Sequence, residues 1–403
     1  MELLTSQIRD YAWGSREVIA QLQGRPSPSP GPEAELWLGA HPAAPSTVER
    51  GGVPVSLAEL IDQDPQGWLG GSTAARFDGR LPYLMKVLAA RTPLSLQAHP
   101  DAARARQRYA AERSGGAEGG VRNYVDPYHK PELLVAISAF DALCGFRDPA
   151  RSAQALAALR LDALEPVVKS LRTGTVGLPE AIETLLGWPA DDRAALVSAA
   201  VAAVDGLPAR YAADGALLTD LATHYPADPG VLVALLLNQV RLAPGEAVWM
   251  PAGNLHAYLR GAGIEIMAAS DNVLRGGLTP KRVDVAELLR VLRFDVLDEP
   301  VVRPRSVAPG VITWPVPAAE FSLHRVVLDA DVSQATVAAG GPRVVLCLTG
   351  AVTVDDGVAA VAVPPGRAAV GPARPGSLTI SGAGEAFVAS VNLPGHVRGA
   401  AAW

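Results

Sequence analysis

Cysteine and lysine are both scarce in this chain of 403 residues. The two cysteines, Cys144 and Cys347, stand far apart in the sequence, which excludes the disulfide framework typical of small secreted proteins. We therefore expect a reducing, cytoplasmic environment. Arginine heavily outnumbers lysine, and only four lysines remain. One hypothesis is that they stand where a compact ammonium that can shed its proton is needed, and for any single lysine chance is the plainer explanation.

Long apolar runs are also missing. The longest, at residues 231–237, is too short to cross a bilayer, and residues 1–10 hold acidic and polar side chains where a signal peptide needs an apolar core. Charged residues make up 19% of the chain and the net charge is −6, so neither nucleic acid nor a membrane is an expected partner. An anionic ligand must be bound by positive charge gathered in one local site.

Residue composition and the spacing of apolar residues change along the chain, which predicts several domains. A hydrophobic fraction of 49% is enough to form more than one core. Short apolar runs between glycines and prolines predict strands in residues 1–148 and 238–300, which we expect to form one catalytic β domain. Helical spacing of apolar residues predicts a helical insertion domain at 149–237. Valine-rich runs separated by Pro-Gly or Gly-Gly turns predict a C-terminal β domain at 301–403. The fold class is thus mainly β, with two jelly-roll barrels and an α-helical insertion.

The first motif that carries chemistry is a glutamine and a histidine two residues apart. Gln97 and His99 lie in a short predicted strand, where residues i and i+2 point to the same face. Imidazole is the commonest side-chain ligand for transition metals, and an amide carbonyl can add a neutral oxygen. Taken alone, such a pair is more typical of half-buried polar residues at the end of a strand.

A second motif places an imidazole, an ammonium and a carboxylate within residues 128–132. Pro131 favours extended backbone at Lys130, so Lys130 and Glu132 share one face and His129 takes the other. The apolar run that follows is typical of a core strand, which puts the charges at the mouth of a barrel. A charged surface turn is the plainer interpretation.

The third motif has the form Pro-x-Gly-x-x-His, from Pro251 and Gly253 to His256. Proline and glycine favour a tight hairpin turn, after which the histidine on the returning strand points into the barrel. This arrangement is similar to the second cupin motif. A structural hairpin with an incidental histidine is the alternative.

Polar residues gather again between residues 263 and 281. We expect Asp271, Lys281 and Glu265 to bind a polyhydroxylated, anionic substrate. Arg275 offers a bidentate fork for a phosphate or a developing oxyanion. An ordinary polar loop is the other interpretation.

Together these motifs supply a plausible set of metal ligands. Gln97, His99, Glu132 and His256 provide two imidazoles, a carboxylate and an amide oxygen, which suits Zn²⁺ or another divalent ion. Positions remain for water or for substrate oxygens. Because no cysteine takes part, this is not a structural zinc finger.

Several segments, in the right order up to about residue 290, resemble the type I mannose-6-phosphate isomerase (phosphomannose isomerase) family of the cupin superfamily. They lie at residues 11–14, 35–39, 81–88, 97–100, 128–132 and 270–275. The resemblance implies reversible interconversion of mannose 6-phosphate and fructose 6-phosphate with one zinc ion per chain. It also implies that Gln97, His99, Glu132 and His256 bind the metal and that Arg275 belongs to the active site.

Aldose–ketose isomerisation needs a base that moves a proton between C1 and C2 through a cis-enediol. Lys130 or Lys86 could be that base if burial and the nearby metal depress its pKa, and His129 could assist opening of the sugar ring. The expected partner is a small-molecule sugar phosphate, and we expect a monomer. Two alternatives stay open at this point: a metal-dependent dioxygenase of the cupin superfamily, and a non-catalytic sugar-binding cupin.

Overall fold

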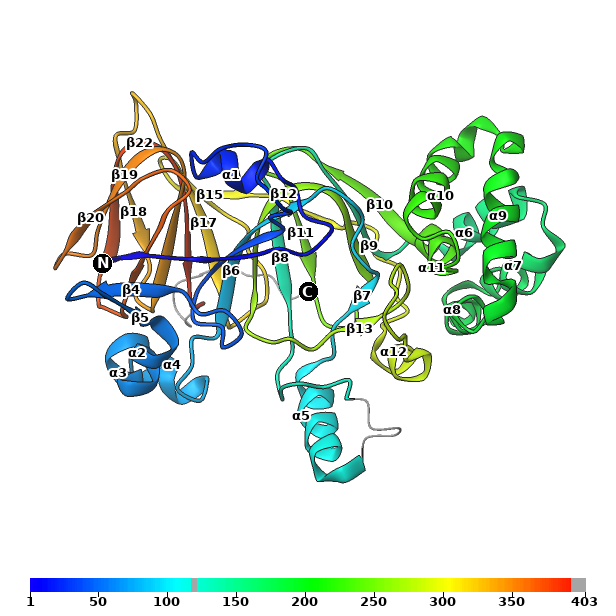
Figure 1. The fold of residues 1–403 in the computed structure, drawn as a ribbon, viewed down its shortest axis with the longest axis horizontal. Coiled ribbons are helices and arrows are strands. Elements are labelled where there is room, and N and C mark those ends of the chain that lie inside the picture. The colour runs from blue at the N-terminus through cyan, green and yellow to red at the C-terminus, as the bar shows by residue number, and fades with distance from the viewer. Residues whose placement is uncertain (117–121, 393–403) are drawn as a thin grey trace.

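The computed structural model describes residues 1–116 and 122–392, and most of its strands belong to two large antiparallel sheets. In Figure 1 the helical block occupies one end of the molecule, the sheet of the C-terminal region the other, and the larger sheet lies between them. The larger sheet has eleven strands: β2 (Gln7–Arg9), β3 (Glu35–Leu38), β6 (Tyr83–Ala90), β7 (Gln97–Ala98), β8 (Glu132–Ala136), β9 (Phe140–Phe146), β10 (Leu237–Leu242), β11 (Ala247–Met250), β12 (His256–Ala268), β13 (Leu274–Arg275) and β14 (Val301–Val302).

The second sheet has nine strands, eight of them from the C-terminal region. They are β1 (Glu2–Leu4), β15 (Arg305–Ala308), β16 (Val311–Thr313), β17 (Ser322–Leu328), β18 (Gln334–Ala338), β19 (Arg343–Asp355), β20 (Ala360–Val363), β21 (Ala368–Gly371) and β22 (Ser377–Ser390). The strand β1 pairs with β21. Residues 2–4, which the sequence assigns to the first β domain, therefore belong to the sheet of the C-terminal region.

The long strand β12 joins two parts of the larger sheet. Its first residues, from His256, pair with β7 and β9, and the stretch from Gly261 to Ala268 pairs with β6 and β8. The bend falls at Gly261, which has φ +123, and a Cβ there would lie 2.5 Å from the carbonyl oxygen of Ala139. Glycine is needed for this backbone. One strand can therefore present His256 and Glu265 from two differently paired parts of the sheet.

The helical block begins where the sequence predicts it, at α6 (Pro149–Ala158), and continues through α7 (Glu165–Leu171), α8 (Leu178–Leu186), α9 (Arg193–Ala202) and α10 (Ala212–His224) to α11 (Gly230–Val233). Asp148 caps α6 by accepting the backbone N–H of Ala150. The buried positions of α8 have the spacing of one helical face: Leu178, Ala181, Ile182, Leu185 and Leu186. Each large side chain buried there stabilises the fold by about 1.5–3 kcal/mol.

The helices outside this block are α1 (Val18–Leu22), α2 (Leu57–Gln63), α3 (Pro65–Leu69), α4 (Gly71–Arg76), α5 (Ala102–Ala111) and α12 (Val285–Val291). The strands β4 (Thr47–Arg50) and β5 (Val53–Ser56) form a separate two-stranded sheet. The two large sheets share one apolar core, in which Val87 and Ile264 of the larger sheet join Leu346 and Phe387 of the smaller. No helix in the described ranges is both long and apolar enough to cross a membrane.

The β-rich class with helical parts is confirmed. The barrels differ from the expectation in one respect, because the strand order of each large sheet is open-ended and does not close into a ring. The sheets still bury their apolar side chains: one cluster lies within the larger sheet, another within the smaller sheet, and a third is shared by both.

Candidate active site

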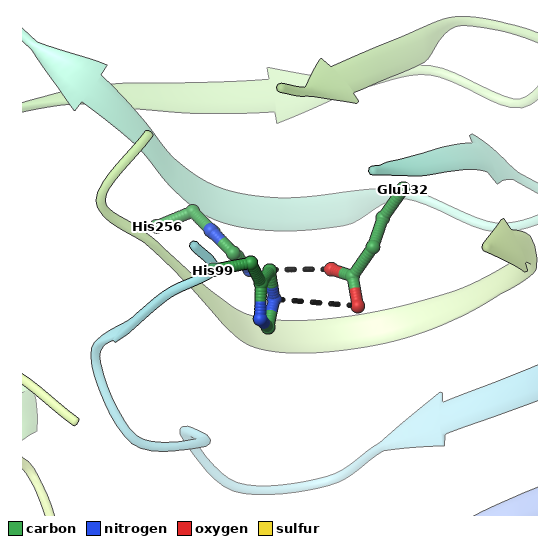
Figure 2. A group of neighbouring side chains, drawn as sticks. All are labelled: His99, Glu132 and His256. Carbon is green, nitrogen blue, oxygen red and sulfur yellow. Dashed lines mark ion pairs between the residues drawn. The ribbon is translucent and has the colours of Figure 1, made fainter. Parts of the chain in front are cut away.

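Three predicted metal ligands converge in the larger sheet. His99 follows β7, Glu132 opens β8 and His256 opens β12, and their ligand atoms all lie within 4.8 Å of one another. The Nε2 atoms of His99 and His256 lie 3.4 and 3.3 Å from the two carboxylate oxygens of Glu132. Figure 2 shows both rings facing that carboxylate. All three residues are buried.

Each imidazole is held by its other nitrogen. His99 Nδ1 lies 2.8 Å from the carbonyl oxygen of Asn272, and His256 Nδ1 lies 3.0 Å from that of Asn254. A carbonyl oxygen can only accept, so both Nδ1 atoms must carry the proton, and a neutral ring then presents the Nε2 lone pair. Burial lowers the pKa of His99 to about 4. The rings therefore aim lone pairs at a carboxylate.

This arrangement requires a cation. Glu132 is negatively charged: burial alone would raise its pKa, but the ammonium of Lys130, 2.8 Å away, brings the pKa well below its ordinary value. His99 Nε2 is buried and has no hydrogen-bond partner among the described residues. Lone pairs facing a carboxylate repel it unless a positive ion lies between them, and this donor set suits Zn²⁺. The residues present thus fit the predicted metal.

Strand pairing brings Gln97 and Arg275 to the same place. Gln97 stands opposite His256 across β7 and β12, and opposite Arg275 across β7 and β13. Directly opposed residues of antiparallel strands point to the same face. Gln97 Nε2 donates to Ser95 Oγ at 3.1 Å, which orients the amide. Ligation of the metal by Gln97 stays a prediction.

Arg275 is a half-buried guanidinium that forms no ion pair within the described part of the chain. Its burial lowers the pKa of the group, but arginine stays charged in any protein environment. A charge that is partly desolvated and lacks a protein counter-ion is suited to an anionic ligand. This is the chemistry expected of it from the sequence.

Lys86 differs from its prediction. Its Nζ lies 3.4 Å from Glu35 Oε1 and 3.2 Å from Glu265 Oε2, and all three side chains are buried. Burial alone would lower the pKa of Lys86, but the two carboxylates raise it above its ordinary value. The condition for Lys86 to act as the base was a depressed pKa, and its protein neighbours act in the opposite direction and hold it as a cation.

Glu265 is a buried carboxylate with a raised pKa. Burial raises its pKa, and the pull of Lys86 in the opposite direction is offset by repulsion from Glu132 and Glu35. The hydroxyl of Tyr258 donates to Glu265 Oε1 at 2.9 Å. Glu265 therefore holds a proton more readily than an ordinary glutamate.

With this geometry in place, the comparisons with known proteins decide the family. Residues 1–149 match the family model described as phosphomannose isomerase type I, catalytic domain. The chain is 34% identical over 392 residues to the mannose-6-phosphate isomerase of Escherichia coli K12, covering 95% of this chain and 98% of that protein. This chain belongs to the mannose-6-phosphate isomerase family. The resemblance seen in the sequence is confirmed, and the family's isomerase class removes the dioxygenase alternative.

More distant relatives and solved structures agree with this family. The mannose-6-phosphate isomerase of Schizosaccharomyces pombe is 33% identical, covering 87% of this chain and 89% of that protein. A crystal structure of a variant of the phosphomannose isomerase of Salmonella typhimurium superposes with a TM-score of 0.87 at 30% identity, covering 98% of this chain and all of that one. Another mannose 6-phosphate isomerase structure, with a TM-score of 0.83, is bound with zinc and yttrium.

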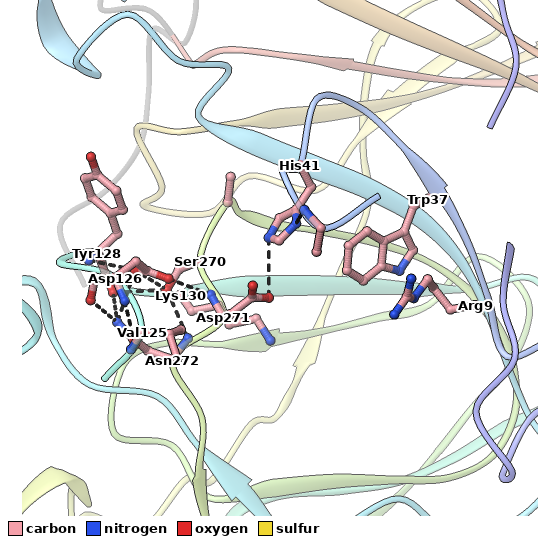
Figure 3. Close-up of polar contacts among 12 residues, drawn as sticks. Arg9, Trp37, His41, Val125, Asp126, Tyr128, Lys130, Ser270, Asp271 and Asn272 are labelled. Carbon is pink, nitrogen blue, oxygen red and sulfur yellow. Dashed lines mark hydrogen bonds and ion pairs between the residues drawn. The ribbon is translucent and has the colours of Figure 1, made fainter. Parts of the chain in front are cut away.

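Three of the predicted residues have contacts outside the metal cluster. His129 Nε2 lies 2.7 Å from Glu320 Oε1, which directs the ring toward the C-terminal region. Asp271 is half-exposed and lies 3.3 Å from His41 Nε2 (Figure 3). Lys281 is exposed in the loop before α12. Of these, His129 and Lys281 are the members of the predicted site that the structure supports least.

Some residues of this family member's site escaped the sequence reasoning. Glu35 and Tyr258 each contact a predicted residue, Lys86 and Glu265 respectively. The alternation of β12 was a usable signal for Tyr258, which lies two residues after His256 on the same strand. Glu35 and His41 gave no such signal, because their partners come from strands and loops distant in the sequence.

Proposed function

We propose that this chain interconverts mannose 6-phosphate and fructose 6-phosphate, with one zinc ion held by His99, Glu132 and His256 and by Gln97 as a fourth ligand. The convergence of three ligand atoms within 4.8 Å carries the proposal. A carboxylate faces two imidazole lone pairs there, inside a family of isomerases. The register that places Gln97 opposite His256 supports the fourth ligand.

When bound, zinc polarises the sugar oxygens at C1 and C2 and so eases loss of a neighbouring C–H proton. We assign the proton transfer to Lys130, whose Nζ lies 2.8 Å from Glu132 Oε1, beside the ligands. The ion pair with Glu132 holds Lys130 as a cation, so this role requires that the bound metal take over the carboxylate and free the amine to lose its proton. The neutral amine would then accept the proton from C2 of the open-chain aldose and return it to C1 through a cis-enediol. Its position next to a metal ligand supports this role.

Lys86 and Glu265 stabilise the charge that develops in this step. Lys86, kept protonated by Glu35 and Glu265, donates hydrogen bonds to the sugar oxygen that becomes negative. Glu265, whose pKa is raised, can exchange a proton with a substrate hydroxyl. This pair thus takes the electrophilic role, while Lys130 moves the proton.

Substrate binding falls to Arg275 and Asp271. The guanidinium of Arg275, which has no ion pair among the residues that the structure describes, holds the phosphate or the enediolate oxygen. Asp271 is half-exposed at the edge of the site and accepts hydrogen bonds from sugar hydroxyls. His129 assists ring opening only if its contact with Glu320 is given up on binding, and we assign Lys281 a weak contact with substrate phosphate at most.

A coupled assay of fructose 6-phosphate formation tests the function. We expect activity with mannose 6-phosphate that a chelator abolishes and zinc restores. Reaction in deuterium oxide tests the proton transfer: deuterium in the product supports it, and complete absence of solvent label contradicts it. A protein that binds zinc and mannose 6-phosphate without turnover would instead be a sugar-binding cupin.

We further propose one zinc per chain, a monomer and a cytoplasmic location. We also propose the three domains predicted from the sequence, except that residues 2–4 join the C-terminal sheet and residues 301–302 the larger sheet. Cys144 and Cys347 are both buried and free, which supports a reducing compartment. The boundaries at residues 149 and 237 are supported by the start of α6 and by the chain's return to the larger sheet at β10.

A further inference from the structure

Asn272 joins two chain segments that meet beside the candidate metal site (Figure 3). It is fully buried. Its main-chain carbonyl accepts the Nδ1–H of His99 at 2.8 Å. Its side chain extends to the irregular segment 125–128, which leads into Lys130 and Glu132.

The side-chain amide of Asn272 replaces the ladder bonds that this segment lacks. Nδ2 donates to the carbonyl oxygens of Asp126 and Tyr128 at 2.7 and 2.8 Å, and Oδ1 accepts the backbone N–H of Val125 at 2.9 Å. The Tyr128 carbonyl also accepts from Ser270 Oγ at 3.1 Å, so the Asn272 amide is its second partner. Backbone groups in a partly buried place need such partners. One amide therefore fixes the path of residues 125–128.

Further hydrogen bonds, made by Ser270 and Asp271, connect the same two segments. Ser270 Oγ donates to Asp126 Oδ1 at 2.9 Å and accepts from the backbone N–H of Asn272 at 3.2 Å. The backbone N–H of Asp271 donates to Asp126 Oδ2 at 2.8 Å. Residues 270–272 and 125–128 therefore form one hydrogen-bonded unit.

We propose that Asn272 is a positioning residue that fixes the ring of His99 and the approach of Lys130 to Glu132 at the same time. Its carbonyl sets the direction of the His99 Nε2 lone pair. Its amide sets the backbone two residues before Lys130, whose Nζ reaches Glu132 Oε1 at 2.8 Å. The inference rests on the proposed zinc site. It adds the residue that holds His99 in position relative to Lys130 and Glu132.

Asn254 provides a matched control. Its carbonyl accepts His256 Nδ1–H at 3.0 Å, as that of Asn272 does for His99. Its side-chain amide, however, reaches only the sulfur atoms of Cys144 and Met250, at 3.6 and 3.3 Å. Truncating Asn254 leaves a ring-orienting carbonyl in place and releases no loop.

The experiment compares zinc affinity, by competition with a chelating dye, for the parent and for N272D, N272A and N254A. N272D keeps the shape of the side chain but loses two donors and adds a charge beside Asp126. We expect zinc affinity about 10- to 100-fold weaker in N272D and N272A, an altered visible spectrum of bound Co²⁺, and a change under about threefold in N254A.

Two outcomes overturn the proposal. In the first, N272D has the zinc affinity and the Co²⁺ spectrum of the parent, even if its thermal stability falls. In the second, N272D and N254A lose zinc affinity to the same extent. If neither Asn272 variant folds, S270A decides the question. A several-fold loss of zinc affinity in S270A supports the proposal, and an unchanged affinity overturns it. A parent protein that binds no zinc refutes the proposed site itself, which is a different result.

Discussion

Replacing Lys86 with methionine removes one charge from the buried group of Glu35, Lys86 and Glu265. The substitution keeps the length of the side chain and most of its apolar contact. The cation lost lies 3.4 and 3.2 Å from the two carboxylates. Both carboxylates are more than nine-tenths buried, so water cannot replace the missing partner.

Removing one member of a buried ion pair costs about 3–5 kcal/mol of folding free energy near neutral pH. The cost depends on pH with a definite sign. Without Lys86, the raised pKa of Glu265 rises further. Such a carboxyl has a higher pKa in the folded protein than in the unfolded chain, where the pKa is 4.5. Its contribution to stability is complete below pH 4.5 and is lost as the pH rises through the pKa of the folded state. The destabilisation by K86M is therefore largest at high pH.

Thermal unfolding of the metal-free protein at pH 5 and pH 8 measures this effect. At pH 8 we expect K86M to lower Tm by roughly 6–20 °C for a cooperative unit of about 150–250 residues, with a smaller loss at pH 5. K169M is the control, since Lys169 is exposed in α7 and should change stability by less than about 0.5 kcal/mol. The reasoning is refuted if K86M melts like the parent at pH 8, or if its loss of Tm grows toward low pH.

Three further predictions follow from individual residues. R275A should lower kcat by about 10²- to 10³-fold and leave zinc affinity unchanged, as measured by steady-state kinetics and chelator competition; a loss of zinc would place Arg275 in the metal site instead. Burial lowers the pKa of His324 from 6.5 to about 4, so its stabilising contribution is present above pH 6.5 and lost as pH falls. The free energy of unfolding, measured with urea, should therefore fall by about 3 kcal/mol less in H324Q than in the parent between pH 6.5 and pH 4. An H324Q pH profile identical to that of the parent would refute this. G261A should cost at least about 1–3 kcal/mol, because φ is +123 and a Cβ would meet Ala139 at 2.5 Å; G206A, with nothing within 4 Å of its Cβ, is the control, and equal Tm values for the two would contradict the account of the β12 bend.

Local patterns predicted much of this structure because they depend on neighbours in the sequence. The spacing of apolar residues found the helical block, and the alternation of strands placed Lys130 and Glu132 on one face, where they form an ion pair. The order of the motifs indicated a family that the comparisons confirm.

Contacts between segments that lie far apart in the sequence could not be predicted from local patterns. The pKa of Lys86 depends on Glu35 and Glu265, which lie on two other strands, so its direction could not be known before the sheet order. His129 was expected near the substrate but contacts Glu320, because the C-terminal region packs against that face. The same holds for β1, whose partner β21 lies near the other end of the chain.

The account depends most on a divalent ion bound by His99, Glu132 and His256, and anomalous diffraction from zinc-loaded crystals at the zinc edge tests it directly. We predict one strong peak per chain, about 2.0–2.2 Å from the Nε2 atoms of both histidines and from an oxygen of Glu132. A peak bound elsewhere, or none among these three side chains at full zinc loading, would contradict the central claim.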